Sequence, residues 1–437
     1  MQHRKTIAVC TLGCKVNQYD TDAVLAQFRA AGYELVDFDQ DADVYLINTC
    51  TVTNMGDRKS RQMIRRAHRQ NPDARVVVMG CLAQASPEQV VEIEGVDLVV
   101  GTHQREDLLR LVESLPERDS QPVCVVVDDI FAVDEFEELP VSSFEGRTRA
   151  TLKIQDGCSQ FCSYCRVPYA RGKPRSRPLA AVVEQAEIIA QQGYQEIVLT
   201  GVHLGAYGQD FDPQLDLSDA IKALLPVPGL ERIRISSVDP HEITPELLEL
   251  VAYEPKVCAH LHIPLQSGSD SVLQRMRRRY TTSEYRRIVE HAYQQIPELA
   301  VTTDVIVGFP GETDAEFGET MQFVEEMAFS RLHVFRYSRR TGTPAARFPN
   351  QIPASVKDER SQALIKLGEG LARNFHARYV DRDVDVLVEE VQGGIGEGLT
   401  ANYVRVQFAA ESDRLVGTTV TVHGKTADAK GIWGILV

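Results

Sequence analysis

Three cysteines, Cys158, Cys162 and Cys165, are so close in the sequence that their thiols can meet on one inorganic group. They follow a short strand-like stretch that breaks at Gly157, which predicts a loop able to turn all three sulfur atoms inward. Thiolates select zinc, copper(I) or iron-sulfur clusters. A structural zinc ion takes four ligands, and no further Cys or His occurs before His203. A 4Fe-4S cluster on three cysteines keeps one iron open for a cosubstrate; a zinc loop, or a disulfide with a spare thiol, is the alternative.

Three more cysteines each come shortly after an apolar run that is typical of a buried strand. These are Cys14, Cys50 and Cys81, and helical patterns separate the runs, so residues 4–117 are expected to form an open parallel α/β sheet. The carboxyl ends of parallel strands meet at one edge, where such sheets bind ligands. The pattern indicates a second three-cysteine site, with three unrelated buried cysteines as the alternative. The remaining cysteines lie inside apolar runs and are expected in the core: Cys10, Cys124 and Cys258.

The length of 437 residues suits about three globular domains. No apolar stretch of about 18 residues occurs, so no membrane span is expected. Met1 to Lys5 lead into a strand rather than into a signal segment. Nine cysteines, an odd number, argue against a disulfide framework. These features favour a cytoplasmic protein with reduced thiols that are free to bind metal.

A mostly acidic segment, residues 118–145, is interpreted as a domain junction. From residue 146 to 375 strands and helices alternate again, which predicts an incomplete (β/α)6 barrel followed by a trailing helix at 357–378. The cysteine loop follows the first of these strands, at the end where barrel enzymes place their chemistry. Residues 376–437 change to short strands with glycine turns and predict a small all-β barrel. The strand candidates of the central domain are 152–154, 196–200, 232–236, 260–265, 301–307 and 332–337.

The net charge of −15 argues against a nucleic-acid partner, but arginines are clustered locally. One cluster runs from Arg58 to Arg69 and another from Arg275 to Arg279, and each is as easily a solvated face. The cluster beside Cys165 is interpreted as a phosphate-binding rim. The β tail has six Lys and Arg against nine Asp and Glu, so strong attraction to RNA is not expected there. The rim consists of Arg166, Arg171, Lys173, Arg175 and Arg177.

Several motifs resemble the radical S-adenosylmethionine (SAM) methylthiotransferase family over nearly the whole chain. Residues 11–20, 48–53 and 79–81 look like the amino-terminal domain of that family. Residues 156–165, 171–172 and 262–269 resemble its radical SAM domain, and the β tail resembles its TRAM domain. Within the family, residues 200–205 and 335–344 are similar to the branch that acts on threonylcarbamoyladenosine beside the tRNA anticodon.

The resemblance implies two 4Fe-4S clusters and SAM as cofactors. It places one cluster on Cys14, Cys50 and Cys81, where sulfur is methylated and transferred, and the other on the closely spaced cysteines, where SAM yields a radical. It also implies the tRNA anticodon stem-loop and a flavodoxin-type reductant as partners, while the oligomeric state stays open. The residues expected near SAM are Thr200, Gly201, Gln266, Ser267, Asp304, Gly308 and Phe309.

Three hypotheses follow. The first is methylthiolation of threonylcarbamoyladenosine in tRNA. The second keeps this chemistry but acts on isopentenyladenosine in tRNA or on an aspartate of a ribosomal protein. The third is a non-catalytic RNA-binding protein that zinc or a single cluster stabilises, which the iron content would distinguish.

Overall fold

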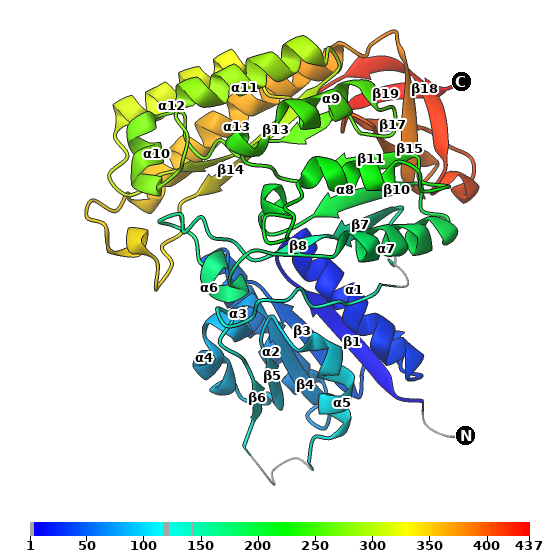
Figure 1. The fold of residues 1–437 in the computed structure, drawn as a ribbon, viewed down its shortest axis with the longest axis vertical. Helices are drawn as coiled ribbons and strands as arrows, with labels where there is room; N and C mark the ends of the chain where they lie inside the picture. Colours follow the sequence, from blue (N-terminus) through cyan, green and yellow to red (C-terminus); the bar gives the residue numbers. More distant parts are fainter. Residues whose placement is uncertain (1–3, 117–121, 142–143, 145) are drawn as a thin grey trace.

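The first domain is built around a parallel sheet of six strands, coloured blue and cyan in Figure 1. The structure is a computed structural model that describes residues 4–116, 122–141, 144 and 146–437. The strands are β1 (Thr6–Thr11), β2 (Glu34–Val36), β3 (Val44–Thr49), β4 (Arg75–Gly80), β5 (Leu98–Val100) and β6 (Cys124–Val126). Their order is β2-β1-β3-β4-β5-β6, so the carboxyl ends of β1, β3 and β4 lie side by side.

Helices cover both faces of this sheet because its central strands are apolar on both sides; every residue of β3 is buried. One face packs against α1 (Lys15–Ala30) and α5 (Leu108–Glu113). The other packs against α2 (Asn54–Gln70), α3 (Cys81–Ala85) and α4 (Pro87–Val91). The open parallel α/β sheet predicted for this part of the chain is confirmed.

The segment expected to be a junction is in contact with both of its neighbours. Strand β6 lies within it and pairs with β5 in parallel. Further along, Leu139, Val141 and Phe144 are buried in the core of the second domain. Residues 118–121, 142–143 and 145 of this segment lie outside the described residues. The described part of the segment is therefore packed against the domains rather than a free linker.

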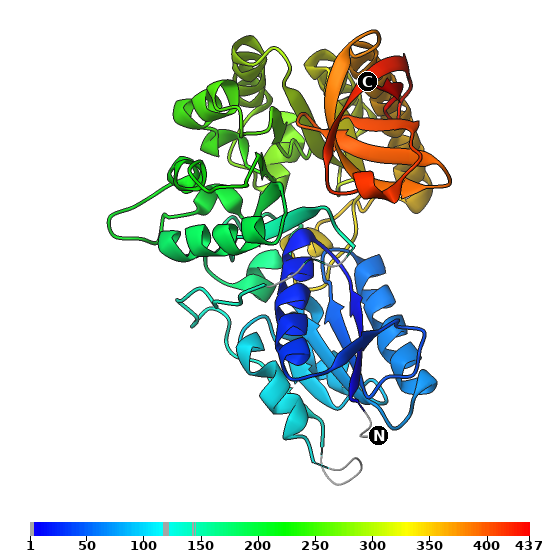
Figure 2. The same cartoon turned by 90° about the vertical axis from the view of Figure 1, so that its right-hand side faces the viewer.

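The second domain contains six parallel strands in two sheets (Figures 1 and 2). One sheet holds β7 (Arg149–Lys153), β10 (Glu196–Thr200) and β11 (Arg232–Ile235), and the other holds β12 (His260–His262), β13 (Ala300–Val307) and β14 (Arg331–Arg336). Single parallel bridges, including Ser237 with His262, join β11 to the second sheet. Across the described residues β14 does not pair with β7, so the incomplete barrel predicted from the sequence is confirmed.

Helices surround this barrel and bury one continuous apolar core against its outer face. The first of them ends just before Gly193. A helical pattern over residues 179–192 followed by a glycine predicts such a stop, and the φ of +90° at Gly193 confirms it. The last helix crosses back over the barrel, where Gly368 leaves no room for a β-carbon beside Leu332. The helices are α7 (Leu179–Gln191), α8 (Leu217–Leu224), α9 (Pro245–Tyr253), α10 (Asp270–Met276), α11 (Thr282–Gln295), α12 (Asp314–Met327) and α13 (Ala354–Ala377).

The tail forms a closed barrel of five strands, in the order β15-β16-β17-β19-β18. The apolar pattern of the tail predicts strands at 384–388, 403–408, 420–422 and 432–437, and it misses the second strand of the barrel because glycines interrupt the pattern there. Those glycines are needed for close packing, since a β-carbon on Gly398 would lie 2.2 Å from the carbonyl oxygen of Leu387. The strands are β15 (Asp383–Gln392), β16 (Ile395–Thr400), β17 (Arg405–Ala409), β18 (Thr419–Ala427) and β19 (Ile432–Leu436).

The tail docks on the end of the large barrel at which the strands begin. There Arg234 donates to the carbonyl oxygens of Thr400 and Ala401 at 3.2 and 2.8 Å. In the same turn Tyr403 stacks on His260 with ring centroids 4.7 Å apart, and the Arg234 guanidinium lies over the Tyr403 ring at 4.8 Å. This turn therefore closes the end of the large barrel at which its strands begin.

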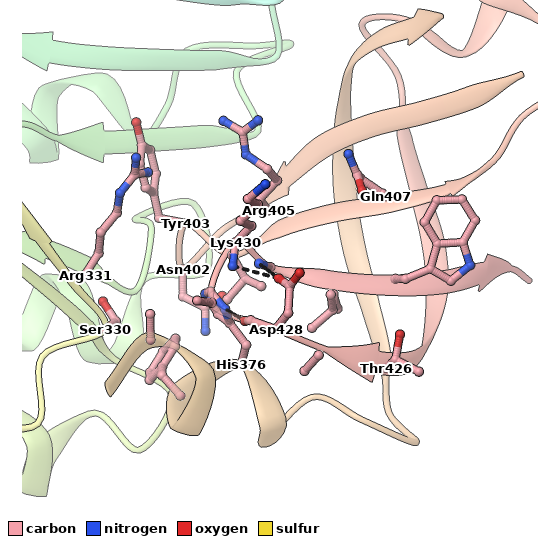
Figure 3. A pocket seen from close by; sticks show the side chains of 18 of the residues that line it. Ser330, Arg331, His376, Asn402, Tyr403, Arg405, Gln407, Thr426, Asp428 and Lys430 are labelled. Atoms are coloured by element: carbon pink, nitrogen blue, oxygen red, sulfur yellow. Dashed lines mark hydrogen bonds between the residues drawn. The ribbon is translucent and has the colours of Figure 1, made fainter. Parts of the chain in front are cut away.

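A hollow of about 540 Å³ lies beside this contact. Figure 3 shows that Arg331 of the barrel, His376 of α13 and the tail residues Arg405 and Lys430 surround it. No cysteine of either triad lines it among the described residues. Because it lies at the end opposite the cysteine loop, it is not the place for the predicted chemistry. Among the described helices none is long and apolar enough to cross a membrane.

Candidate active site

The closely spaced cysteines lie in a loop that a short antiparallel strand pair holds closed. Strand β8 (Gln155–Asp156) pairs with β9 (Arg175–Ser176), and α6 (Val167–Arg171) lies between them. At Gly157 φ is +79°, and a β-carbon there would lie 1.7 Å from the carbonyl oxygen of Lys173. Only glycine fits this position, so the loop must turn here.

Cys158, Cys162 and Cys165 form the second triad, named for the second domain in which they lie, and Cys14, Cys50 and Cys81 of the first domain form the first triad. Each sulfur atom of the second triad has a hydrogen-bond donor at 3.4 Å. The backbone N–H of Gln160 donates to Cys158, that of Val167 donates to Cys165, and the Arg278 guanidinium donates to Cys162. The pKa of Cys165 is raised to about 12, mainly because the thiol is buried and secondly because the Cys162 thiol lies next to it. The Cys165 thiol therefore stays protonated until a metal group replaces its proton.

The first triad is assembled from the ends of three neighbouring strands. Cys14 precedes α1, Cys50 directly follows β3, and Cys81 is the first residue of α3. The pKa of Cys50 is raised to about 12, mainly because the thiol is buried. The Cys81 thiol makes the next largest contribution that raises it, and Cys14 adds a smaller one. The structure thus brings together three thiols that are far apart in the sequence.

A glycine makes room for this first triad. Gly13 has a φ of +106°, and a β-carbon there would lie 3.0 Å from both the Cβ and the Sγ of Cys50. On the other side Asn17 is buried, and its amide donates to the carbonyl oxygens of Leu12 and Thr49 at 2.7 and 2.9 Å. The turn before α1 is therefore fixed beside the sulfur atoms.

The spacing of the thiols suits a cluster better than a single zinc ion. Tetrahedral zinc with Zn–S bonds of about 2.3 Å holds its sulfur ligands about 4 Å apart. Among the described residues, neither triad has all three sulfur atoms within 4.8 Å of one another.

All nine cysteines are free thiols. Of those expected in the core, Cys258 is buried, while Cys10 and Cys124 are only half-buried.

One arginine of the second domain reaches the cysteine site of the first. Arg171, which ends α6 just after the cysteine loop, donates from Nε to the Cys81 sulfur at 3.4 Å and from Nη2 to Asn17 at 2.6 Å. Its Nη1 lies 3.0 Å from Asp156, the residue before Gly157. The second domain therefore supplies a cation to the cysteine site of the first.

A buried ion network surrounds Arg171. Asp20 on α1 accepts a hydrogen bond from Lys153 at 2.9 Å, and it forms ion pairs with Arg171 at 2.8 Å and with Arg105. Burial alone raises the pKa of Asp20, but these cations outweigh it and lower the value to about 2. Each carboxylate thus stays charged inside the interface. No sequence signal revealed these partners.

The interpretation of the arginines after Cys165 as a phosphate-binding rim is wrong for most of them. Arg171, Arg175 and Arg177 are at most 3% exposed, and their guanidiniums bind protein groups. Lys173 is exposed but pairs with Asp134. Because the network neutralises buried carboxylates, these cations are not available to RNA. Only Arg166 keeps a half-exposed place.

The residues expected near SAM fall into three places. Thr200 ends β10 and Gly201 follows it, and a β-carbon on Gly201 would lie 2.9 Å from Gln155. Gln266, with φ at +64°, exchanges backbone hydrogen bonds with β13 at Asp304 and Ile306. The remaining residues lie against packing partners. Ser267 contacts Thr320 of α12, and Gly308 lies against Lys357 of α13. Phe309 is buried against Tyr337 and Phe348.

Histidines that the sequence reasoning did not assign lie near these groups. Asp304 sits between His262 and His333, at 3.3 and 3.1 Å. Burial alone raises the pKa of Asp304, but hydrogen bonds from both histidines hold it well below its usual range. Beside the second triad, burial lowers the pKa of His203, but hydrogen bonds with Cys158 and Glu242 outweigh it and raise the value to about 10. His203 is therefore a second cation next to these thiols.

Comparison with known proteins agrees with this geometry. Residues 6–101 match the model of the family described as "Uncharacterized protein family UPF0004", and residues 152–324 match that of the Radical SAM superfamily. A solved radical SAM methyltransferase, TsrM from Kitasatospora setae, has the same fold with a TM-score of 0.59; the match covers 90% of this chain and 80% of that one, at 15% identity.

Relatives with curated names cover nearly the whole chain. A threonylcarbamoyladenosine tRNA methylthiotransferase from Bacillus subtilis is 48% identical, over 95% of this chain and 93% of that protein. One of the same name from Aquifex aeolicus is 41% identical, over 95% and 99%. A tRNA-2-methylthio-N(6)-dimethylallyladenosine synthase from Pelotomaculum thermopropionicum is 35% identical, over 99% and 98%. With two cysteine triads and these relatives, the chain belongs to the tRNA methylthiotransferase family of radical SAM enzymes.

Proposed function

We propose that this protein adds a methylthio group to carbon 2 of the adenine in threonylcarbamoyladenosine of tRNA. The observation that carries the proposal is that each of two docked domains holds a cysteine triad, and that Arg171 crosses their interface to bind Cys81 of the first domain while it pairs with Asp156 of the second. The names of relatives at 41–48% identity support the choice of nucleoside. A hydrogen on this carbon is neither acidic nor easily displaced, so acid-base groups alone do not suffice.

In this proposal each triad holds a 4Fe-4S cluster: Cys14, Cys50 and Cys81 hold one, and Cys158, Cys162 and Cys165 hold the other. Bound SAM supplies radical chemistry and the methyl group. The protein stabilises the thiolates with the N–H groups and guanidiniums described above and excludes water by burial. Thr200, Gly201, Gln266 and Asp304 contact SAM, while Ser267, Gly308 and Phe309 shape its site by packing.

The partners follow from the reaction. The substrate is the anticodon stem-loop of tRNA, and a flavodoxin-type protein supplies electrons to the second cluster. Both partners place the work of this protein in the cytoplasm.

Nucleoside mass spectrometry tests the proposal. Total tRNA is taken from a host without its own enzyme that expresses either the intact protein or its Cys162→Ala variant. We expect the methylthio mass on threonylcarbamoyladenosine with the intact protein alone. A methylthio mass on isopentenyladenosine would keep the chemistry but change the substrate. Its absence from both nucleosides would refute tRNA methylthiolation, and full activity of the variant would refute the role of the second triad.

A further inference from the structure

A cleft of about 470 Å³ opens where α2 of the first domain meets the second domain. Its walls carry five arginines, which come from both domains. Three of them, Arg58, Arg61 and Arg65, recur at helical spacing along one side of α2. The other two, Arg166 and Arg340, come from the second domain. In a chain with a net charge of −15 this local concentration of cations is exceptional.

Among the described residues that line the cleft, one of these five charges has a carboxylate partner. Asp57 is the one carboxylate in that described lining, and Arg340 already pairs with it at 2.7 Å. Arg61 donates to the neutral amide of Gln89 at 2.6 Å, and Arg166 donates to the carbonyl oxygen of Ala85 at 2.9 Å. Four guanidinium charges therefore remain for a ligand, and that ligand must be a polyanion.

The cleft borders both cysteine triads. Arg166 directly follows Cys165. On the other wall α2 begins just after Cys50, and a β-carbon on Gly56 would lie 3.6 Å from the Cys50 sulfur. The short loop between Cys50 and α2 exposes Val52 (53% exposed), and the first turn of α2 exposes Met55 (70% exposed). Cations and apolar groups thus meet beside the gap between the two triads.

We propose that this cleft binds the backbone phosphates of the single-stranded RNA loop that flanks the target base, with Val52 and Met55 against the bases. The inference rests on the proposed function, and it names the surface that positions the RNA. When the target base lies between the triads, the phosphates of its neighbouring nucleotides lie at the opening of this cleft. Arginine forks match phosphate oxygens, and unpaired RNA offers base faces to apolar side chains.

Charge reversal on α2 tests the proposal, and the helix offers a matched control. Arg58 and Arg65 line the cleft seven residues apart, and both are exposed. Lys59 and Arg66 are also exposed and seven residues apart, but their charges act on Cys10 of β1, away from the cleft. The double variants Arg58→Glu/Arg65→Glu and Lys59→Glu/Arg66→Glu therefore change the net charge equally.

The dissociation constant for a fluorescent anticodon stem-loop RNA is measured by anisotropy at several salt concentrations, with the iron-loaded protein. We expect the cleft variant to bind at least about tenfold more weakly, and the salt slope to fall by about 1.4, because two contacts to single-stranded phosphates are lost. The control should stay within about twofold of the intact protein. Met55→Ser should weaken binding without changing the salt slope. Equal iron content in all variants shows that they are folded.

Equal loss of RNA binding in both double variants would overturn the proposal. So would unchanged RNA binding in the cleft variant together with slower reduction by a flavodoxin, which would assign the cleft to the electron donor. If the intact protein yields no methylthio product but its RNA binding still depends on Arg58 and Arg65, the proposed function fails and the RNA-binding cleft stands.

Discussion

The two cysteine triads differ in how much of the chain must fold before their sulfur atoms meet. The second triad lies within one loop, closed by β8, β9 and Gly157. The first depends on the register of β1, β3 and β4 and on the turn at Gly13. Their cations differ as well, since Arg278 of the second triad comes from its own domain, while Arg171 reaches the first triad from the other domain. The first site is therefore complete only when the domains are docked.

The largest expected effect comes from removing one thiol of either triad. Cys50→Ala and Cys162→Ala should each abolish the methylthio product and each lower the iron content by about half, from about eight irons per chain. Only Cys50→Ala should still cleave SAM under reducing conditions, because the second triad is intact. Iron analysis and chromatography of the cleaved SAM check this. Loss of all iron in either variant would show that the sites are not independent.

Cutting the bridge between the domains should have the next largest effect. Arg171→Met leaves Asp156 and Asp20 short of a buried partner, which costs about 3–5 kcal/mol of unfolding free energy. We expect iron to be lost from the first triad and not from the second.

The exposed pair of Lys173 with Asp134 provides the control, two residues away. Lys173→Met should change stability by less than about 1 kcal/mol. Denaturant unfolding of both variants compares them, and similar losses would contradict the role of the buried network.

Acid should weaken the same interface. The folded pKa of Asp20, about 2, lies below the ordinary value of about 4. Its contribution, about 2–3 kcal/mol, is therefore present above pH 4 and is lost as the pH falls through 2. Thermal unfolding of the metal-free protein between about pH 6 and pH 2 measures it. The Asp20→Asn variant should show a shallower decline, and an identical pH profile would refute this assignment.

The smallest predicted change is at Gly13. Gly13→Ala adds backbone strain of about 1–3 kcal/mol and a β-carbon against Cys50. Gly32, with φ at +86° and nothing within 4 Å of a β-carbon, is the matched control. Both alanine variants should lose similar stability, but only Gly13→Ala should lower the iron content of the first triad. Equal iron contents would show that the contact with Cys50 is unimportant.

The sequence predicts structure best where the determining pattern is local. The strands before Cys14, Cys50 and Cys81, the cysteine loop and the glycine at the end of α7 all follow from spacing and residue type. Contacts across the domain interface could not be predicted in this way. Nothing in the charge run that contains Arg171 and Arg175 indicates that these arginines bind carboxylates on α1 and β8. The basic cleft was missed for the same reason, since its arginines come from three separate segments of the chain: α2, the residue after Cys165, and Arg340.

Tyr403 makes the tail a structural part of the large barrel. Its ring stacks on His260 and lies beneath the guanidiniums of Arg149 and Arg234, two of the cations that surround the buried carboxylate of Glu196. A chain that ends after α13 would expose this cluster of buried charges to water. Truncation therefore cannot remove the tail without disturbing the barrel, and an exchange of tails between related enzymes must keep an aromatic side chain at this turn.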